Sequence, residues 1–130
     1  APETFDVKGF TELIKNLRHK RNSRVPLFDR SLDEVVKNAR EIPAEQEYII
    51  AEGNYLLLNK DSWRDLYDYW DYQVFLSVES SVLKSRLIER WLSENHTYSE
   101  AEARVLKNDL VNADIVNSNR LNATVEFQTG

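Results

Sequence analysis

The sequence has no cysteine and no methionine, and it has only three glycines in 130 residues. Without cysteine the chain cannot hold a disulfide framework, a thiolate metal site or a cysteine nucleophile. The glycines Gly9, Gly53 and Gly130 cannot form a phosphate-binding loop of the G-x-x-x-x-G-K-[ST] or G-x-G-x-x-G type. Any nucleotide chemistry therefore needs a phosphate-binding loop from outside these residues.

Long apolar runs are also absent. No stretch approaches the roughly 18 apolar residues of a membrane span, and no signal-peptide pattern is present. The chain carries 17 Lys+Arg against 22 Asp+Glu, and this net charge of −5 disfavours a nucleic-acid partner. We expect a cytoplasmic protein of one domain, with no membrane and no nucleic acid as partner. Because the chain starts at Ala1 rather than Met, we expect a processed N-terminus or a piece of something longer.

Hydrophobic periodicity predicts strands that alternate with helices. A helix is expected over residues 7–20 with Asp6 as its N-cap, and others from about Ser62, over 81–93 after Ser80, and from a Ser99-x-x-Glu102 capping box to about Asn112. Strands are expected over 47–52, 72–78 and 123–127, with an extended stretch at 24–28 and a short helix around 32–38. This alternation predicts an α/β fold with a parallel sheet and flanking helices.

Glu52 is the first candidate site residue, because it stands at the carboxyl end of the predicted strand 47–52. Ligands of open parallel sheets bind at that edge, where a carboxylate can hold Mg²⁺ through water or orient an attacking hydroxyl. The alternative is that Glu52 only caps a turn in which Gly53 supplies an unusual backbone angle.

Two arginines form the second candidate. Arg86 and Arg90 stand four residues apart on one face of a predicted helix, so their guanidinium groups could clamp phosphate oxygens. The alternative is ordinary helical pairing with Glu89 and Glu94.

The third candidate is the run Phe28, Asp29 and Arg30, which follows the extended stretch. An aromatic ring, a carboxylate and a guanidinium together could bind a polyhydroxylated small molecule. Equally, Asp29 could only form a turn and Arg30 could be an ordinary surface residue. Neither His19 nor His96 has a partner at metal-ligand spacing, and the aromatic cluster at 67–72 is assigned to the core or to a subunit interface.

Several strings together resemble the uridine kinase, phosphoribulokinase and bacterial pantothenate kinase group of P-loop kinases. The similarity is strongest to the bacterial nucleoside/nucleotide kinase branch associated with fructose transport. In chain order the strings are Pro2-Glu3-Thr4-Phe5-Asp6, Pro26-Leu27-Phe28-Asp29-Arg30, Glu52-Gly53-Asn54-Tyr55-Leu56-Leu57, Arg86-Leu87-x-x-Arg90, more loosely Asn108-Asp109-x-x-Asn112-Ala113, and Arg120-x-x-Ala123.

The resemblance implies ATP- and Mg²⁺-dependent transfer of phosphate to a hydroxyl of a small molecule such as a sugar, a nucleoside or a pantothenate-like alcohol. By position, Glu52 matches the acidic residue near the metal, and Arg86 and Arg90 match arginines of a lid. Phe28, Asp29 and Arg30 fall in the substrate loop, and Asn117 and Arg120 fall near the adenine. Nucleoside-specific members have a histidine where this chain has Asp33, which disfavours uridine and cytidine.

By the same resemblance, residues 1–130 correspond to the C-terminal two thirds of one kinase domain, with a substrate loop at about 21–46 and a lid at about 84–104. The phosphate loop and a central strand between 48–52 and 72–78 would have to come from a missing N-terminal segment or a second subunit, and a homodimer is possible. The chain alone is then not expected to be a competent enzyme. The alternative is a non-catalytic module, derived from a kinase, that binds a partner or senses a ligand.

Overall fold

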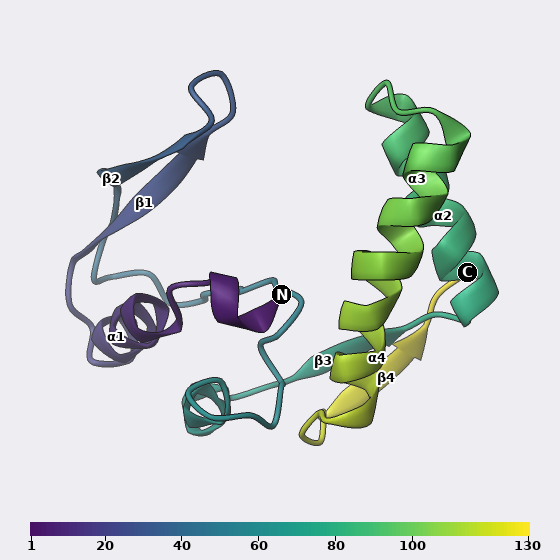
Figure 1. The fold of residues 1–130 in the computed structure, drawn as a ribbon. Helices are drawn as coiled ribbons and strands as arrows, with labels where there is room; N and C mark the ends of the chain where they lie inside the picture. The colour runs from purple at the N-terminus through teal and green to yellow at the C-terminus, as the bar shows by residue number, and fades with distance from the viewer. The chain divides into compact units, whose positions relative to one another are not determined.

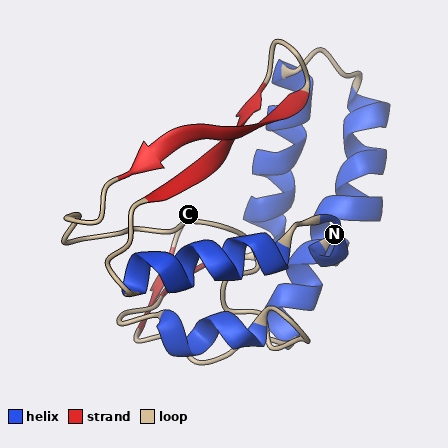
Figure 2. Cartoon of the chain, turned by 90° about the vertical axis from the view of Figure 1, so that its left-hand side faces the viewer, coloured by secondary structure: helices blue, strands red, loops and turns tan.

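A computed structural model describes all of residues 1–130, which form two compact units. Unit 1 consists of Ala1–Phe5 with Asn54–Gly130, and unit 2 is Asp6–Gly53. Figure 1 labels the helices and strands of both units, and Figure 2 colours them by type. No helix has the length and apolar character that crossing a membrane requires.

Unit 2 contains helix α1 (Val7–Arg18) and an antiparallel hairpin of β1 (Ser23–Asp29) and β2 (Glu34–Ile42). The carboxylate of Asp6 accepts a hydrogen bond from the Gly9 backbone N–H at 2.9 Å, which confirms the predicted N-cap. Val7 and Ile14 are buried on the inner face of α1, seven residues and therefore about two turns apart.

The hairpin replaces the short helix predicted around 32–38, so that prediction is wrong. The β-branched pair Val35 and Val36 lies in β2 and stands opposite Phe28 and Leu27 of β1. Cross-strand pairs of this kind stabilise a sheet, and they outweigh the weak helical pattern that the segment shows when it is taken alone. The extended stretch predicted at 24–28 is confirmed as part of β1.

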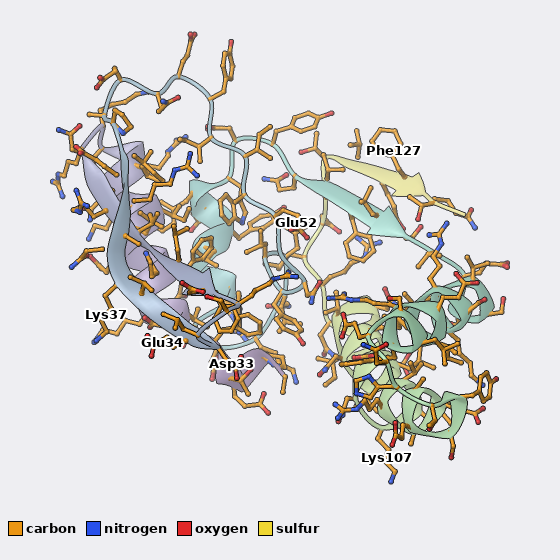
Figure 3. All side chains as sticks on the ribbon, turned by 90° about the horizontal axis from the view of Figure 1, so that it is seen from above. Asp33, Glu34, Lys37, Glu52, Lys107 and Phe127 are labelled. Carbon is orange, nitrogen blue, oxygen red and sulfur yellow. The ribbon has the colours of Figure 1, made fainter.

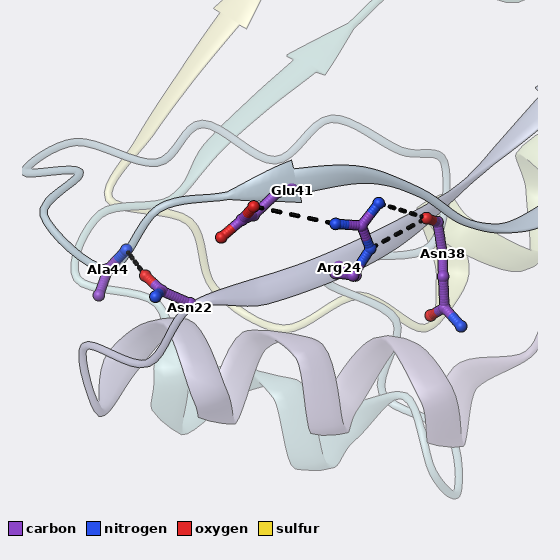
Figure 4. Close-up of polar contacts among 5 residues, drawn as sticks. All are labelled: Asn22, Arg24, Asn38, Glu41 and Ala44. Atoms are coloured by element: carbon purple, nitrogen blue, oxygen red, sulfur yellow. Dashed lines mark hydrogen bonds and ion pairs between the residues drawn. The ribbon is translucent and has the colours of Figure 1, made fainter.

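A bulge interrupts the hairpin beside Pro26, which has no N–H to give to the ladder. Opposite it, Asn38 adopts a positive φ of 51°. The Arg24 guanidinium donates two hydrogen bonds, of 2.9 and 3.1 Å, to the Asn38 carbonyl, and it lies 3.8 Å from Glu41 (Figure 4). A side chain thus satisfies a carbonyl in the irregular part of the ladder.

The strand predicted over 47–52 does not form. Residues 48–53 have no regular structure, and the side chains of Tyr48 and Ile50 are 82% and 95% exposed. A strand needs a neighbour to take up its backbone hydrogen bonds, and both hairpin strands of unit 2 pair only with each other. The apolar run therefore stays exposed within its unit.

Unit 1 holds the parallel part of the fold. Strands β3 (Val74–Ser77) and β4 (Val125–Gln128) pair in parallel, in the order Val74 with Val125 to Ser77 with Gln128. The remaining elements are η1 (Pro2–Thr4), η2 (Arg64–Tyr69), α2 (Ser80–Ser93), α3 (Tyr98–Arg104), the π-helical turn η3 (Val105–Asp109) and α4 (Leu110–Ser118). The strands at 72–78 and 123–127 and the helix at 81–93 are confirmed, whereas the helix predicted from Ser62 is a short 3₁₀ helix.

The core of unit 1 forms around Leu58 and Leu66, which are both fully buried. In the same unit, the rings of Phe5, Tyr55 and Trp63 make three edge-on or tilted contacts at centroid distances of 5.5–6.1 Å. The Trp63 indole also donates a hydrogen bond to the Pro2 carbonyl at 3.3 Å. The segment before α1 and the segment after Gly53 are thus joined by aromatic packing.

Helix α2 packs against the long helical stretch formed by α3, η3 and α4. Their shared core consists of Ile88, Ala101 and Val105. The long stretch starts from Thr97, whose hydroxyl accepts from the Glu100 N–H while the Glu100 carboxylate accepts from the Thr97 N–H. The capping box predicted at Ser99 and Glu102 is therefore wrong by two residues, because Thr97 satisfies the same pattern one half-turn earlier.

Candidate functional site

Helix α2 brings Arg86 and Arg90 together on its exposed face. Residues four apart lie about 40° from each other around a helix, so both side chains leave α2 on the same side. The Arg86 guanidinium lies close to the C-terminal Gly130. Arg90 lies 3.6 Å from Glu94, and both side chains are largely exposed. Arg86 has no carboxylate partner. Ordinary ion pairing therefore accounts for Arg90 but leaves Arg86 with its charge available to an anion.

The hairpin tip carries Phe28, Asp29 and Arg30. One carboxylate oxygen of Asp29, Oδ1, accepts hydrogen bonds from the Ser31 N–H, the Ser31 hydroxyl and the Leu32 N–H at 2.9, 2.5 and 3.2 Å. These bonds, the hydroxyl first, lower the pKa of Asp29 below its usual range. None of them uses Oδ2, so the turn holds the carboxylate in place with one oxygen left to accept from a ligand.

Glu52 lies in the unpaired segment before Gly53 and is exposed (Figure 3). The alternative, in which Glu52 only caps a turn and Gly53 supplies an unusual backbone angle, is wrong about Gly53, because the only glycine with positive φ is Gly130. No group of three acidic or histidine side chains could hold a metal ion. Mg²⁺ in phosphate-transferring sites is often held by one or two carboxylates together with substrate phosphates and water, so a single carboxylate fits that role.

Asn117 and Arg120 lie at the end of α4 and just after it. Asn117 is exposed, whereas the Arg120 side chain is 24% exposed. The guanidinium of Arg120 stands 4.0 Å from the centre of the Phe75 ring and 2.6 Å from the Glu126 carboxylate. Arg120 thus joins the segment after α4 to both β3 and β4.

The side chains of Trp91 and Asp109 meet between α2 and η3, a contact that the sequence motifs do not predict. The Trp91 indole donates a hydrogen bond to Asp109 at 2.8 Å. The available signal was a tryptophan on the same helical face as Leu87 and Ile88, but no sequence pattern shows which residue lies opposite it.

Comparisons with known proteins place the chain among kinases. It is 35% identical to YggC, an uncharacterized protein of Escherichia coli, and 32% identical to a candidate uridine kinase of Schizosaccharomyces pombe, each over 98% of this chain. The chain spans 53% and 56% of the length of these two relatives. It is 31% identical over 93% of its length to an ATP-dependent kinase-like protein of Aspergillus versicolor, of which it covers 74%. No family model matches the chain.

Solved structures give the same result for the fold. A crystal structure described as that of a candidate fructose transport system kinase from Silicibacter superposes with a TM-score of 0.91 at 41% identity, over 98% of this chain and 62% of the other. YFH7 of Saccharomyces cerevisiae, a candidate P-loop kinase with a circular permutation, superposes over the whole chain and 49% of its own with a TM-score of 0.82 at 20% identity, which shows the fold alone. The α/β fold is that of P-loop kinases, and the chain belongs to the P-loop kinase family whose members include proteins named uridine kinase and pantothenate kinase.

Proposed function

We propose that this chain supplies the acceptor-binding and lid parts of an ATP-dependent phosphotransferase that acts on a hydroxyl of a small molecule. The observation that carries the proposal is the exposed arginine pair of α2, in which Arg86 has no carboxylate partner. A chain of this kinase family with an unpaired guanidinium on a helical face has a group available to neutralise phosphate charge. The acceptor would be a sugar, a nucleoside or a pantothenate-like alcohol in a cytoplasmic setting.

Each candidate residue then has a role of its own. Glu52 would hold Mg²⁺ through water beside the phosphates. Arg86 and Arg90 would neutralise charge on the transferred phosphoryl group, and such preorganised cations act most strongly where water is excluded. Asp29 would accept a hydrogen bond from an acceptor hydroxyl through Oδ2, while Asn117 and Arg120 would border the adenine.

The phosphate-binding loop would come from a segment outside these 130 residues or from a second subunit. Support for such a segment comes from the apolar strand β3, of which Val74 and Leu76 are 48% and 63% exposed. Strand β3 also pairs only with β4, so a further strand on its other side could take up the backbone hydrogen bonds of that edge.

Asp29 gives the test of the acceptor site. In the complete protein, Asp29→Asn keeps an oxygen for the turn bonds but removes the charge, so we expect KM for the acceptor alcohol to rise about tenfold, with KM for ATP unchanged. Kinetics against a panel of sugars, nucleosides and pantothenate measure both values. Arg40→Gln, which changes an exposed charge in β2 away from the tip, is the matched control. An unchanged acceptor KM in Asp29→Asn contradicts this assignment.

The alternative of a partner-binding or ligand-sensing module is favoured by one observation, the exposed apolar side chains of Ile50, Leu76 and Phe127. Calorimetry of the complete protein separates the two functions. Binding of a sugar or nucleoside without any ATP turnover favours the sensor.

A further inference from the structure

The Trp91 side chain is held from three directions. Its indole N–H donates to Oδ2 of Asp109 at 2.8 Å. The guanidinium carbon of Arg104 stands 4.9 Å from the ring centre, within the range of a cation–π contact. The His96 ring lies edge-on at a centroid distance of 5.1 Å. All three partners follow α2 in the chain, so the tryptophan joins α2 to the turn and the long helical stretch that come after it.

The π-helical turn η3 explains how two residues of the long stretch reach one ring. Arg104 and Asp109 are five residues apart, and in a regular α-helix they would point about 140° away from each other. In η3 the Leu110 N–H donates to the Val105 carbonyl, which is the i to i+5 bond of a π-turn. Residues five apart then lie about one turn above one another. The wide turn therefore brings Arg104 and Asp109 to the same side, facing Trp91.

The position of Trp91 on α2 also fixes where the arginines point. Leu87, Ile88 and Trp91 belong to the face that packs on the long stretch. Arg90 and Arg86 lie about 100° and 140° from Trp91 around the helix, on the exposed side. Because apolar contacts are non-directional, the core of Ile88, Ala101 and Val105 permits small rotations of α2. A hydrogen bond between two fixed atoms selects one rotation.

We propose that Trp91 is a positioning residue: its bond to Asp109 fixes the rotation of α2 and so holds Arg86 and Arg90 in the orientation needed for phosphoryl transfer. This inference rests on the proposed phosphotransferase function. Neither Trp91 nor Asp109 touches substrate in it. Their effect passes through the two arginines, which should meet the phosphates fully only in the transition state.

Kinetics of the complete protein test the effect on transfer. Trp91→Phe keeps an aromatic ring but loses the N–H donor, and Asp109→Ala loses the acceptor. Each should lower kcat by about three- to tenfold with little change in KM for ATP or acceptor, as expected for the loss of one hydrogen bond that matters in the transition state. The double variant should be no worse than either single one, and Asp109→Asn, which keeps an acceptor oxygen, should recover most of the rate.

Trp70→Phe is the matched control, because the Trp70 indole also donates one hydrogen bond, to the Leu56 carbonyl at 3.2 Å, away from α2. It should leave kcat unchanged. If Trp70→Phe lowers kcat as much as Trp91→Phe does, general destabilisation explains the loss and the proposal is wrong.

A distance measurement tests the position of α2 without any activity. These 130 residues contain no cysteine, so once any cysteine elsewhere in the complete protein is replaced, spin labels can be attached at Ser85→Cys and Ala103→Cys, which are exposed on α2 and α3. Electron–electron resonance should give a narrow distance distribution in the parent protein and in Asp109→Asn, and a broader one in Trp91→Phe and Asp109→Ala. An unchanged distribution in all variants overturns the proposal. If the complete protein shows no ATP turnover, the proposed function is contradicted instead. The distance distribution between the two spin labels still shows whether Trp91 fixes the position of α2.

Discussion

At the scale of single residues, two fully buried leucines and two buried aromatic rings form one of the packed parts of unit 1. Leu58 and Leu66 are 0% exposed, and Tyr55 and Trp63 are 4% and 7% exposed. Residues of this kind set how much free energy one substitution can remove, because the space left behind closes only in part.

We expect Leu66→Ala to lower the free energy of unfolding by about 2–5 kcal/mol, because it leaves a cavity in a closed core. Leu106→Ala is the matched control, since the Leu106 side chain is 48% exposed in a helical stretch. Its effect should stay within about 1 kcal/mol. Urea unfolding measures both, and equal losses in the two variants would contradict the assigned core.

Tyr55 should make the free energy of unfolding depend on pH in the alkaline range. Burial, and after it the negative charges of Glu3 and Asp109, raise the pKa of Tyr55. Because the folded protein favours the neutral phenol, its contribution to stability is complete below the ordinary phenol pKa of about 10 and is lost as pH rises through the folded value. Unfolding measured from pH 8 upward should show this loss in the parent protein and a smaller one in Tyr55→Phe. Identical curves would count against the burial of the hydroxyl.

At the scale of elements, the start of α3 shows how a cap fixes a helix boundary. The reciprocal bonds of Thr97 and Glu100 leave two fewer unpaired N–H groups at this end. The backbone N–H of Thr97 is the main cause that lowers the pKa of Glu100. The folded state therefore favours the ionised carboxylate of Glu100 over the protonated acid.

Thr97→Ala should lower the free energy of unfolding by about 0.5–2 kcal/mol, as for other lost N-caps. The depressed pKa of Glu100 means that its contribution is present above the ordinary glutamate pKa and is lost as pH falls through the folded value. Glu100→Gln keeps an acceptor for the box and should remove that acid dependence. Circular dichroism during unfolding between pH 2 and pH 7 measures both effects, and a Glu100→Gln profile that still follows the parent would refute the cap's role.

The same elements show where sequence patterns succeed and fail. Asp6 and the apolar stripe of α1 are local features, so that helix could be predicted within about two residues. Thr97 with Glu100 and Ser99 with Glu102 both fit the sequence pattern of a capping box. Only the hydrogen bonds in the structure show that the helix starts after Thr97. Strand β2 forms because it pairs with β1, and the sequence of residues 32–38 taken alone does not predict that pairing.

At the scale of the whole molecule, the sheet is where the sequence predicts more than these 130 residues form. The apolar run at 48–52 reads as a buried strand, yet it is unpaired, and β3 pairs only with β4. Single positions such as Glu52, Arg86 and Asp29 could be chosen from the sequence because their motifs are contiguous. The contact of Trp91 with Asp109 could not, because it depends on the π-helical turn.

If a further segment completes the sheet, the backbone amides of 48–52 and of β3 should exchange with deuterium more slowly in the complete protein than in the 130-residue chain alone. The amides of Ala101 and Val105, in the core between α2 and the long stretch, serve as the internal control and should change little. Equal exchange at 48–52 in both proteins would contradict sheet completion at that place.

ATP turnover by the complete protein is the decisive test of phosphoryl transfer supported by the arginines of α2. We measure ATP-dependent phosphorylation of sugars, nucleosides and pantothenate by the parent protein, Arg86→Ala, Arg90→Ala and the control Lys107→Ala, which changes an exposed cation on the long helical stretch (Figure 3). We expect turnover of at least one alcohol, a kcat lowered by about 10³-fold or more in both arginine variants, and full activity in Lys107→Ala. Equal activity in all four proteins would contradict the role of α2, and no turnover of any alcohol by the parent protein would contradict the function itself.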